Sequence, residues 1–144
     1  MSPEAKSLLV GTFELDAYQK DGYAIARGLF TPDEVEQYRA HYMALHAQEK
    51  GFFTVEQKAA ADTDPLKKYP RMIHMHRWDQ ISLDWMLEQR IQHCLTQLLG
   101  AEPYAVQTML YFKPPGARGQ ALHQDQAPLN VQPGTCMAAW MALD

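Results

Sequence analysis

The segment Gln120-Ala121-Leu122-His123-Gln124-Asp125-Gln126 carries a His-x-Asp pair at its centre, and the rest of the chain is interpreted around it. In an extended backbone, side chains two positions apart point to the same face, so His123 and Asp125 are predicted to reach a common point. A histidine and a carboxylate are two of the three ligands in the 2-His-1-carboxylate triad that holds non-haem Fe(II) in oxygenases. The chain contains 6 His, so one such tripeptide can arise by chance and is a weak signal by itself.

Two flanking segments give the pair its context. Upstream lies Gln107-Thr108-Met109-Leu110-Tyr111-Phe112-Lys113-Pro114-Pro115-Gly116, and downstream lies Ala138-Ala139-Trp140-Met141-Ala142-Leu143-Asp144. Together with the His-x-Asp, these motifs resemble the phytanoyl-CoA dioxygenase family of Fe(II)- and 2-oxoglutarate-dependent oxygenases. The resemblance begins near Tyr18-Gln19-Lys20-Asp21-Gly22-Tyr23 and runs to the last residue. Its motifs are specific in combination and weak singly.

This resemblance implies a fold. The expected class is α+β or mainly β, with a double-stranded β-helix (jelly roll) core and N-terminal helices packed outside it. One domain is expected over residues 1–144, with a helical part at 13–100 and the first jelly-roll strands at 101–144. A jelly roll has about eight strands, whereas the sequence predicts roughly four. The core is therefore expected to be incomplete in this chain.

The resemblance also assigns roles to five residues. It implies that His123 and Asp125 bind Fe(II), and that Gln107, Tyr111 and Trp140 lie at the site of the 2-oxoglutarate cosubstrate or the substrate. An ordinary core position is the alternative for Trp140, and a solvent-facing strand face is the alternative for the other two. The family's second metal-binding histidine and its 2-oxoglutarate-binding arginine lie downstream of the His-x-Asp, and no Arg follows Asp125. The chain is therefore expected to be the N-terminal part of a longer family member or a truncated gene product.

Length and composition restrict the class of protein. A chain of 144 residues is expected to form one domain with a real core, and its 47% hydrophobic and 21% charged residues are ordinary for a globular protein. The net charge of −4 provides no basic field for nucleic acid, and no apolar run is long enough to cross a membrane. Cys94 and Cys136 are predicted to be reduced thiols rather than a disulfide, which makes the cytoplasm the expected location.

Capping patterns predict helices in the first hundred residues. A short helix is expected over residues 13–20, followed by a strand over residues 23–27. Thr31-Pro32-Asp33-Glu34 combines an N-cap, a proline at the first helical position and a capping-box glutamate. Ser82 is expected to cap a later helix that ends at Gly100. The predicted buried stripes are Val35, Tyr38, Tyr42 and Leu45 in the helix after Thr31, and Leu83, Leu87, Ile91, Leu95 and Leu98 in the later one.

After Pro103 the hydrophobic period falls from about 3.6 to about 2, which predicts strands. Over residues 104–113 one face is expected to pack against helices, and the opposite face, with Gln107 and Tyr111, is the candidate wall of a ligand cavity. A second strand is expected over residues 137–143, where Trp140 between two alanines indicates a large ring in a tight interior. The residues on the helix-packed face are Tyr104, Val106, Thr108, Leu110 and Phe112.

Residues 50–80 show no sustained period, and a loop of this length is usually functional or disordered. Its cluster of Lys67, Lys68 and Arg71 is a candidate attractor for an anionic substrate, with a solvated charged loop as the alternative. His74-Met75-His76 is a second extended-type pair, and Asp79 is its nearby carboxylate. We treat this pair as a minor metal candidate, with lining of the cavity as the other role.

Two helical histidines are assigned away from the metal site. His41 and His46 lie five positions apart, so they do not share one helical face as a metal-binding pair does. Both are predicted to be surface or boundary residues.

Three functional hypotheses follow. The first is a hydroxylase that oxidises a small organic molecule with release of succinate and CO2, using Fe(II) and 2-oxoglutarate. The second is a truncated, non-catalytic family member that acts as a binding or scaffold module. The third and weakest is a cupin-type isomerase or other metal-binding barrel, which needs further histidine ligands. The expected partners are a small-molecule substrate and a second copy of the chain that completes the sheet, with neither nucleic acid nor membrane.

Overall fold

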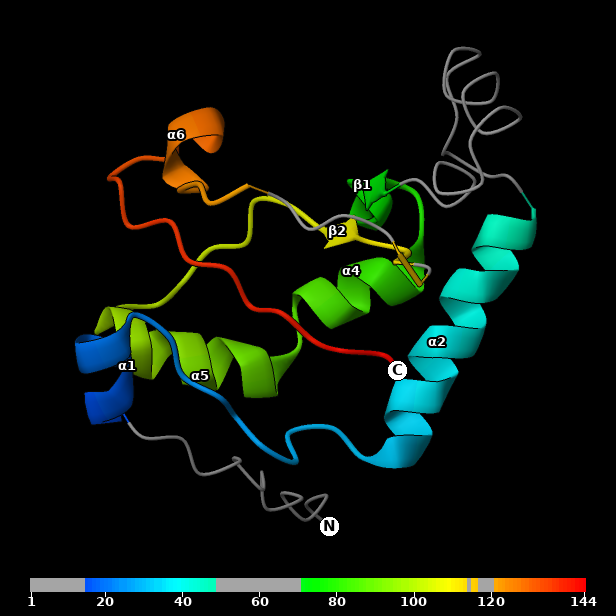
Figure 1. Cartoon of the computed structure of the whole chain (residues 1–144), viewed down its shortest axis with the longest axis horizontal. Coiled ribbons are helices and arrows are strands. Elements are labelled where there is room, and N and C mark those ends of the chain that lie inside the picture. Colours follow the sequence, from blue (N-terminus) through cyan, green and yellow to red (C-terminus); the bar gives the residue numbers. More distant parts are fainter. Residues whose placement is uncertain (1–14, 49–70, 114, 117–120) are drawn as a thin grey trace, which may run out of the picture.

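The computed structural model describes residues 15–48, 71–113, 115–116 and 121–144. Within these ranges helices dominate and two short strands pair (Figure 1). Lys67 and Lys68 lie outside the described residues. The elements are α1 (Leu15–Asp21), α2 (Pro32–Ala47), β1 (Met72–Ile73), the 3-10 helix η2 (Met75–Arg77), α4 (Gln80–Met86), α5 (Gln89–Leu99), β2 (Met109–Leu110) and α6 (Gln126–Leu129).

Helix α2 begins with the capping box that the sequence predicts. The side chain of Thr31 accepts a hydrogen bond from the Glu34 backbone N–H at 3.2 Å, and the Glu34 carboxylate accepts one from the Thr31 backbone N–H at 2.7 Å. Each contact satisfies a backbone donor that the first helical turn leaves without a partner. Of the predicted stripe, Tyr42 and Leu45 are buried and Tyr38 is half-buried.

The predicted helix from Ser82 to Gly100 is two helices, α4 and α5, so the expected single element is wrong. Asp79, not Ser82, caps α4, because its carboxylate accepts the Ser82 backbone N–H at 2.8 Å. Ser82 is fully buried in the first turn. The chain breaks at Leu87, which is exposed, and Glu88 caps α5. Gly100 ends α5 in the left-handed conformation, as expected.

The two strands form a small antiparallel sheet. Met72 pairs with Leu110 and Ile73 pairs with Met109. Of the predicted strand at 104–113, only β2 pairs with another strand. The segments 23–27 and 137–143 were also predicted to be strands, and neither shows strand pairing among the described residues. The predicted face is correct at Thr108, which is 2% exposed, and wrong at the exposed Tyr104 and Val106.

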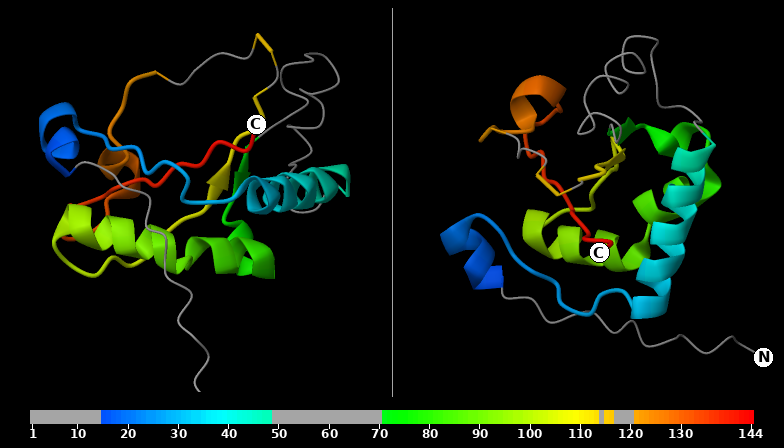
Figure 2. Two further views of the ribbon diagram at one scale, coloured as in Figure 1. Left: turned by 90° about the horizontal axis from the view of Figure 1, so that it is seen from below. Right: turned by 45° about the vertical axis from the view of Figure 1, so that its right-hand side comes forward.

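The hydrophobic core lies where α2 meets the sheet. Its buried members are Tyr42 and Leu45 from α2, Met72 from β1 and Met75 from η2. The C-terminal segment ends near α2 (Figure 2), and Leu143 packs against this cluster. Core packing therefore joins the first long helix to the two strands and to the last residues of the chain. The remaining side chains around the cluster are Tyr38, Leu110 and Phe112.

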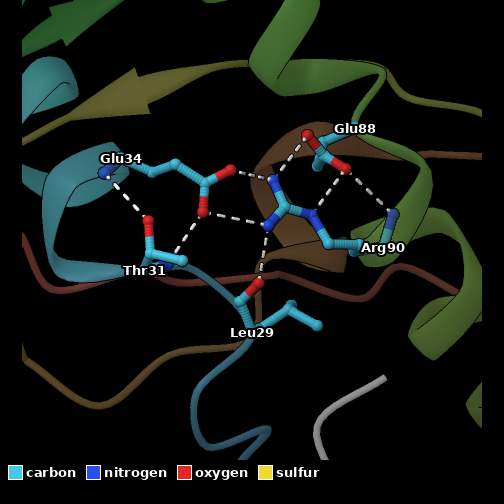
Figure 3. A network of polar contacts seen from close by, with 5 residues as sticks. All are labelled: Leu29, Thr31, Glu34, Glu88 and Arg90. Carbon is cyan, nitrogen blue, oxygen red and sulfur yellow. Dashed lines mark hydrogen bonds and ion pairs between the residues drawn. The ribbon is translucent and has the colours of Figure 1, made fainter. Parts of the chain in front are cut away.

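Arg90 joins the start of α2 to the start of α5 (Figure 3). Its guanidinium donates to the Glu34 carboxylate at 2.9 and 3.1 Å, to the Glu88 carboxylate at 2.9 and 3.1 Å, and to the Leu29 carbonyl at 2.8 Å. It also lies 4.4 Å from the centroid of the Phe30 ring. The hydrogen bonds with Glu88 and Glu34 raise the pKa of Arg90. The hydrogen bond with Arg90 is also the main reason that the pKa of Glu34 is lowered to about 2.

Trp140 departs from the sequence prediction. The interpretation of this residue as a large ring in a tight interior is wrong for the described structure, because the residue is 85% exposed. Its neighbours Met141 and Leu143 still differ in burial from Ala142 between them. An alternating pattern of burial therefore exists here without a strand ladder.

Among the described residues, no helix has the length and apolar character that crossing a membrane requires.

Candidate metal-binding site

The His-x-Asp pair lies at the turn that leads into α6. The backbone at Asp125 is helical, with φ −60° and ψ −29°, and no strand is present at residues 121–125. The expectation of an extended segment is therefore wrong. The two side chains meet nonetheless, with His123 Nε2 and Asp125 Oδ1 3.1 Å apart. A turn before a helix brings them together in place of a pleated strand.

Asp125 stands at the N-cap position of α6, yet its carboxylate makes no capping hydrogen bond. Its backbone carbonyl accepts from the Leu129 N–H at 3.1 Å, which holds the backbone in place. The helix closes at Asn130, whose φ is 48°, a left-handed conformation that asparagine tolerates. The backbone is thus fixed while the carboxylate remains free to face His123.

One hydrogen bond determines which nitrogen of His123 carries a proton. Nδ1 lies 2.7 Å from the carbonyl oxygen of Ala121. A carbonyl only accepts, so Nδ1 must donate. In the neutral ring, Nε2 is then a bare acceptor that faces the acceptor oxygen of Asp125. This arrangement is favourable only when a proton or another cation lies between the two atoms.

The surroundings of His123 agree with that requirement. The hydrogen bond to the Ala121 carbonyl raises the pKa of His123, and the nearby Asp125 carboxylate raises it further. The side chains of His123 and Asp125 are 43% and 48% exposed. The pair is therefore accessible to an ion from solvent.

The donor set fits two neighbouring positions around one metal ion. Bonds of about 2.1 Å that meet at a right angle place two donor atoms roughly 3 Å apart, and the observed separation is 3.1 Å. The Nδ1 contact holds the ring with Nε2 toward the common point, as an outer partner of a ligating histidine does. Within the described ranges, no group of three His, Cys, Asp or Glu residues could hold a metal ion. His123 and Asp125 therefore offer two of the three donors that a 2-His-1-carboxylate triad requires.

Gln126 supports the loop that follows α6, a role that the sequence did not indicate. Its side-chain N–H donates to the Val131 carbonyl at 2.8 Å, while its Oε1 is buried and has no hydrogen-bond partner in the part of the chain that the structure describes. Tyr104 reaches the same loop through a hydrogen bond from its hydroxyl to the Gln132 carbonyl. The segment after the His-x-Asp is therefore tied to the residues before β2.

The other predicted site residues lie around β2 or beyond α6. Gln107 and Tyr111 are half-buried on either side of β2, and Lys113 Nζ lies 5.5 Å from the centroid of the Tyr111 ring. Gln107 makes no hydrogen bond with His123 or Asp125, all three being described residues. Trp140 lies beyond α6 and is exposed. A role for these three residues in binding cosubstrate remains a prediction.

The second histidine pair is not extended either. His74 has φ 60°, in the left-handed region, and His76 lies in η2. The two rings meet edge to face with centroids 5.7 Å apart. His76 Nδ1 lies 2.8 Å from the hydroxyl of Thr108, whereas His74 Nδ1 is buried and has no hydrogen-bond partner among the described residues.

A further polar network joins α2 to α4 and was not predicted. His41 Nε2 lies 3.0 Å from Asp79 Oδ2, and the Ser82 hydroxyl donates to the same oxygen at 2.6 Å. The Tyr42 and Ser82 hydroxyl oxygens are 3.2 Å apart. The pKa of Asp79 is lowered by the contacts with Ser82 and His41, which outweigh its burial. His41 is thus a boundary residue, as expected, with a structural partner.

Comparison with known proteins places the chain in a family. The family profile described as "Phytanoyl-CoA dioxygenase (PhyH)" matches residues 18–144. Phytanoyl-CoA dioxygenase 1 of Oryza sativa subsp. japonica is 26% identical over 131 residues, which cover 86% of this chain and 46% of the relative. Phytanoyl-CoA dioxygenase of Arabidopsis thaliana is 29% identical over 108 residues, which cover 69% of this chain and 38% of the relative.

A third relative carries a different name. Ectoine dioxygenase of Nocardia farcinica (strain IFM 10152) is 26% identical over 110 residues, which cover 76% of this chain and 36% of the relative. No solved structure gives a significant match. The chain spans less than half the length of each of these relatives. Because the family profile covers residues 18–144, the chain belongs to the phytanoyl-CoA dioxygenase (PhyH) family.

Proposed function

We propose that this chain carries part of the active site of a non-haem Fe(II)- and 2-oxoglutarate-dependent dioxygenase that hydroxylates a small organic molecule. The observation that carries the proposal is the contact between His123 Nε2 and Asp125 Oδ1 at 3.1 Å, a geometry that needs a proton or a metal ion between the two atoms. Family membership and the names of the relatives support an oxygenase. The two relatives named for phytanoyl-CoA and the one named for ectoine differ in substrate, so the substrate class stays open.

In this proposal His123 binds the metal as a neutral imidazole through Nε2, and Asp125 binds it through Oδ1. The Ala121 carbonyl keeps the proton on Nδ1 and so keeps the lone pair of Nε2 on the metal side. When bound, Fe(II) with 2-oxoglutarate supplies the oxidation by O2, with succinate and CO2 as coproducts. Gln107, Tyr111 and Trp140 are proposed to contact the cosubstrate or the substrate.

Mn²⁺ binding to the 144-residue chain tests the metal site directly, because Mn²⁺ is stable in air and visible by electron paramagnetic resonance. We expect His123→Ala and Asp125→Asn each to weaken Mn²⁺ binding at least about tenfold, since each removes a direct ligand. His93→Ala is the matched control, because His93 is an exposed histidine on α5 that contacts Gln97. Equal Mn²⁺ affinity in the wild type and both site variants contradicts the proposal.

Turnover tests the chemistry separately from binding. Succinate formation from 2-oxoglutarate is expected only with Fe(II) and only with His123 present. Turnover that continues without metal, or in His123→Ala, rules out this reaction class.

A non-catalytic binding or scaffold module is the second candidate. It is favoured by the finding that the described residues hold two donors and no group of three. In this case the chain folds and binds Mn²⁺ weakly or not at all. Tight binding of one Mn²⁺ per chain argues against this candidate.

We also propose that residues 104–113 and 137–143 are jelly-roll strands, as the resemblance to the family implies. Residues 131–144 make no backbone–backbone hydrogen bond to another described residue, and unpaired strand edges tend to recruit further strands. A second copy of the chain is one source of those strands. Light scattering then reports a dimer at micromolar concentration, and a monomer at every concentration excludes that source.

A further inference from the structure

The turn that presents His123 and Asp125 is followed by a helix that packing does not stabilise. Helix α6 has four residues, and none of them is buried. A single helical turn is unstable by itself, because forming it fixes several residues for very few hydrogen bonds. The core cluster of the described residues contains no member of α6. Polar contacts are therefore needed to fix this part of the chain.

Gln126 makes the contacts that close the turn. Its backbone carbonyl accepts a hydrogen bond from the Asn130 N–H at 2.8 Å, and its side-chain amide donates to the Val131 carbonyl at 2.8 Å. This one residue is therefore bonded to the first two residues after α6. Because Gln126 directly follows Asp125, any movement of its backbone changes the position of the Asp125 carboxylate.

The orientation of the Gln126 amide is energetically unfavourable at its other end. A carbonyl only accepts, so the nitrogen of the amide must face Val131. In this orientation Oε1 is buried and has no hydrogen-bond partner among the described residues. An unpaired buried acceptor destabilises a protein, and each such exception calls for an explanation. A role in function explains an arrangement that stability alone does not favour.

Tyr104 connects the same loop to the sheet. Its hydroxyl donates a hydrogen bond to the Gln132 carbonyl, which directly follows the carbonyl that Gln126 contacts. Tyr104 lies in the segment that leads into β2, and Leu110 of β2 packs against the core cluster. A continuous series of contacts thus runs from the core through Tyr104 and the loop to Gln126, next to Asp125.

We propose that Gln126 is a positioning residue of the metal site, which holds Asp125 where its carboxylate meets Nε2 of His123. This inference rests on the proposed function, because that function assigns the pair to a metal ion. Gln126 itself contacts neither metal nor substrate, and it acts through the backbone of Asp125. Metal and catalytic sites need such support, because their ligands must stay within about 0.5 Å of the productive geometry.

The ¹⁵N signal of His123 Nε2 in the metal-free chain tests the positioning directly. It is measured at one pH at which the ring carries both protons and Asp125 is ionised, so that a proton lies between the two side chains. Asp125→Asn supplies the reference value for a ring without its carboxylate partner. We expect Gln126→Met to move the signal toward this reference, because the carboxylate is no longer held against the ring.

Gln97→Met is the matched control for Gln126→Met. It also removes a side-chain amide contact, the one between Gln97 Nε2 and His93 Nε2 at 2.6 Å on α5. Because this contact is on another helix, we expect the His123 signal of Gln97→Met to stay at the wild-type value.

Mn²⁺ affinity measures the consequence for metal binding. We expect Gln126→Met to weaken Mn²⁺ binding about fivefold, as the loss of one hydrogen bond of ordinary strength does, and Gln97→Met to bind as the wild type. Urea unfolding is measured on the same proteins. The free energy of unfolding of Gln126→Met is expected to stay close to that of the wild type, because the substitution removes the unpaired Oε1 together with the hydrogen bond.

Two further variants decide the test if Gln126→Met does not fold. Gln126→Glu keeps the length of the side chain, but its ionised carboxylate cannot donate to the Val131 carbonyl. The same shift of the His123 signal is therefore expected. Tyr104→Phe removes only the hydroxyl that connects the loop to the sheet, so a smaller shift in the same direction is expected.

The inference is overturned if the His123 signal keeps its wild-type value in Gln126→Met and Gln126→Glu, or if both variants bind Mn²⁺ as tightly as the wild type. A loss of Mn²⁺ affinity that only follows a loss of folding stability, with an unchanged His123 signal, also overturns it. Failure of the proposed function is a separate outcome. A wild-type chain that binds no Mn²⁺ removes that function, whereas the His123 signal still decides whether Gln126 positions the pair.

Discussion

Two charged clusters in this molecule differ in how completely their atoms are paired. The Arg90 cluster between α2 and α5 places one guanidinium against two carboxylates and a backbone carbonyl, and the Arg90 side chain is 19% exposed. The His123 cluster before α6 joins one ring to one carboxylate, both about half exposed, with a bare nitrogen facing an oxygen. The first cluster is closed, and the second is open.

This difference separates stability from function. A closed cluster contributes to folding because each donor meets an acceptor and little water remains to screen the charges. An open cluster contributes little to folding, because exposed pairs are screened. The nitrogen of His123 and the carboxylate oxygen of Asp125 are instead available to an ion or a ligand.

The largest expected effect is that of Arg90→Ala on folding. This substitution leaves Glu34 and Glu88 close together without their shared cation, so we expect the free energy of unfolding to fall by about 2 kcal/mol. The matched control is Arg39→Ala, which removes an exposed ion pair with Glu36 whose side chains are 51% and 59% exposed. Its expected cost is below about 0.5 kcal/mol. Urea unfolding measures both, and equal costs contradict the distinction between closed and open pairs.

Acid should weaken the closed cluster within a defined window. The pKa of Glu34 is depressed from 4.5 to about 2 in the folded chain. Its contribution to stability is therefore complete above pH 4.5 and is lost as the pH falls toward 2. With allowance for solvent screening of this partly exposed carboxylate, the loss is about 1 kcal/mol.

Glu34→Gln isolates that contribution, because glutamine preserves the capping box. Unfolding is measured between pH 5 and pH 2.5 for both proteins. We expect the wild type to lose stability more steeply than Glu34→Gln across this range. Parallel pH profiles show that Glu34 has an ordinary pKa in the folded chain.

Helix ends were predictable from sequence because their causes are local. Thr31, Pro32 and Glu34 lie within four consecutive residues, and the capping contacts they predict are present. Gly100 ends α5 in the left-handed conformation for the same reason. The predicted N-cap of α4, Ser82, was wrong by three residues. Asp79 and Ser82 are both good capping residues, and the tertiary contact with His41 favours Asp79.

Strands were less predictable because a strand requires a partner. The alternating pattern at 104–113 identified Thr108 correctly as a buried residue, but it did not reveal that pairing is limited to β1 and β2. Likewise, the residues on either side of Trp140 predict an interior ring, whereas its exposure depends on which distant segments pack there. The break at Leu87 has no glycine or proline to mark it.

The candidate site shows both outcomes within three residues. The sequence named His123 and Asp125 and predicted that they converge, and the structure places their side-chain atoms 3.1 Å apart. The predicted extended backbone was wrong, because α6 begins at Gln126. The side chains of His123 and Asp125 can meet at a common point from more than one backbone conformation. The orphan nitrogen of His74 had no sequence signal, since it depends on what surrounds the ring.

The smallest expected effect on folding is that of the open cluster itself. His123→Ala and Asp125→Asn each remove one exposed contact, so we expect the free energy of unfolding of each variant to stay close to that of the wild type. The same substitutions are expected to weaken Mn²⁺ binding at least about tenfold. Their effect on function is therefore large and their effect on folding small, which is the opposite of what we expect for Arg90→Ala. Urea unfolding and Mn²⁺ titration on the three variants measure this ratio. A His123 variant that unfolds as readily as Arg90→Ala makes the His-x-Asp pair a structural contact and removes the main argument for a metal site.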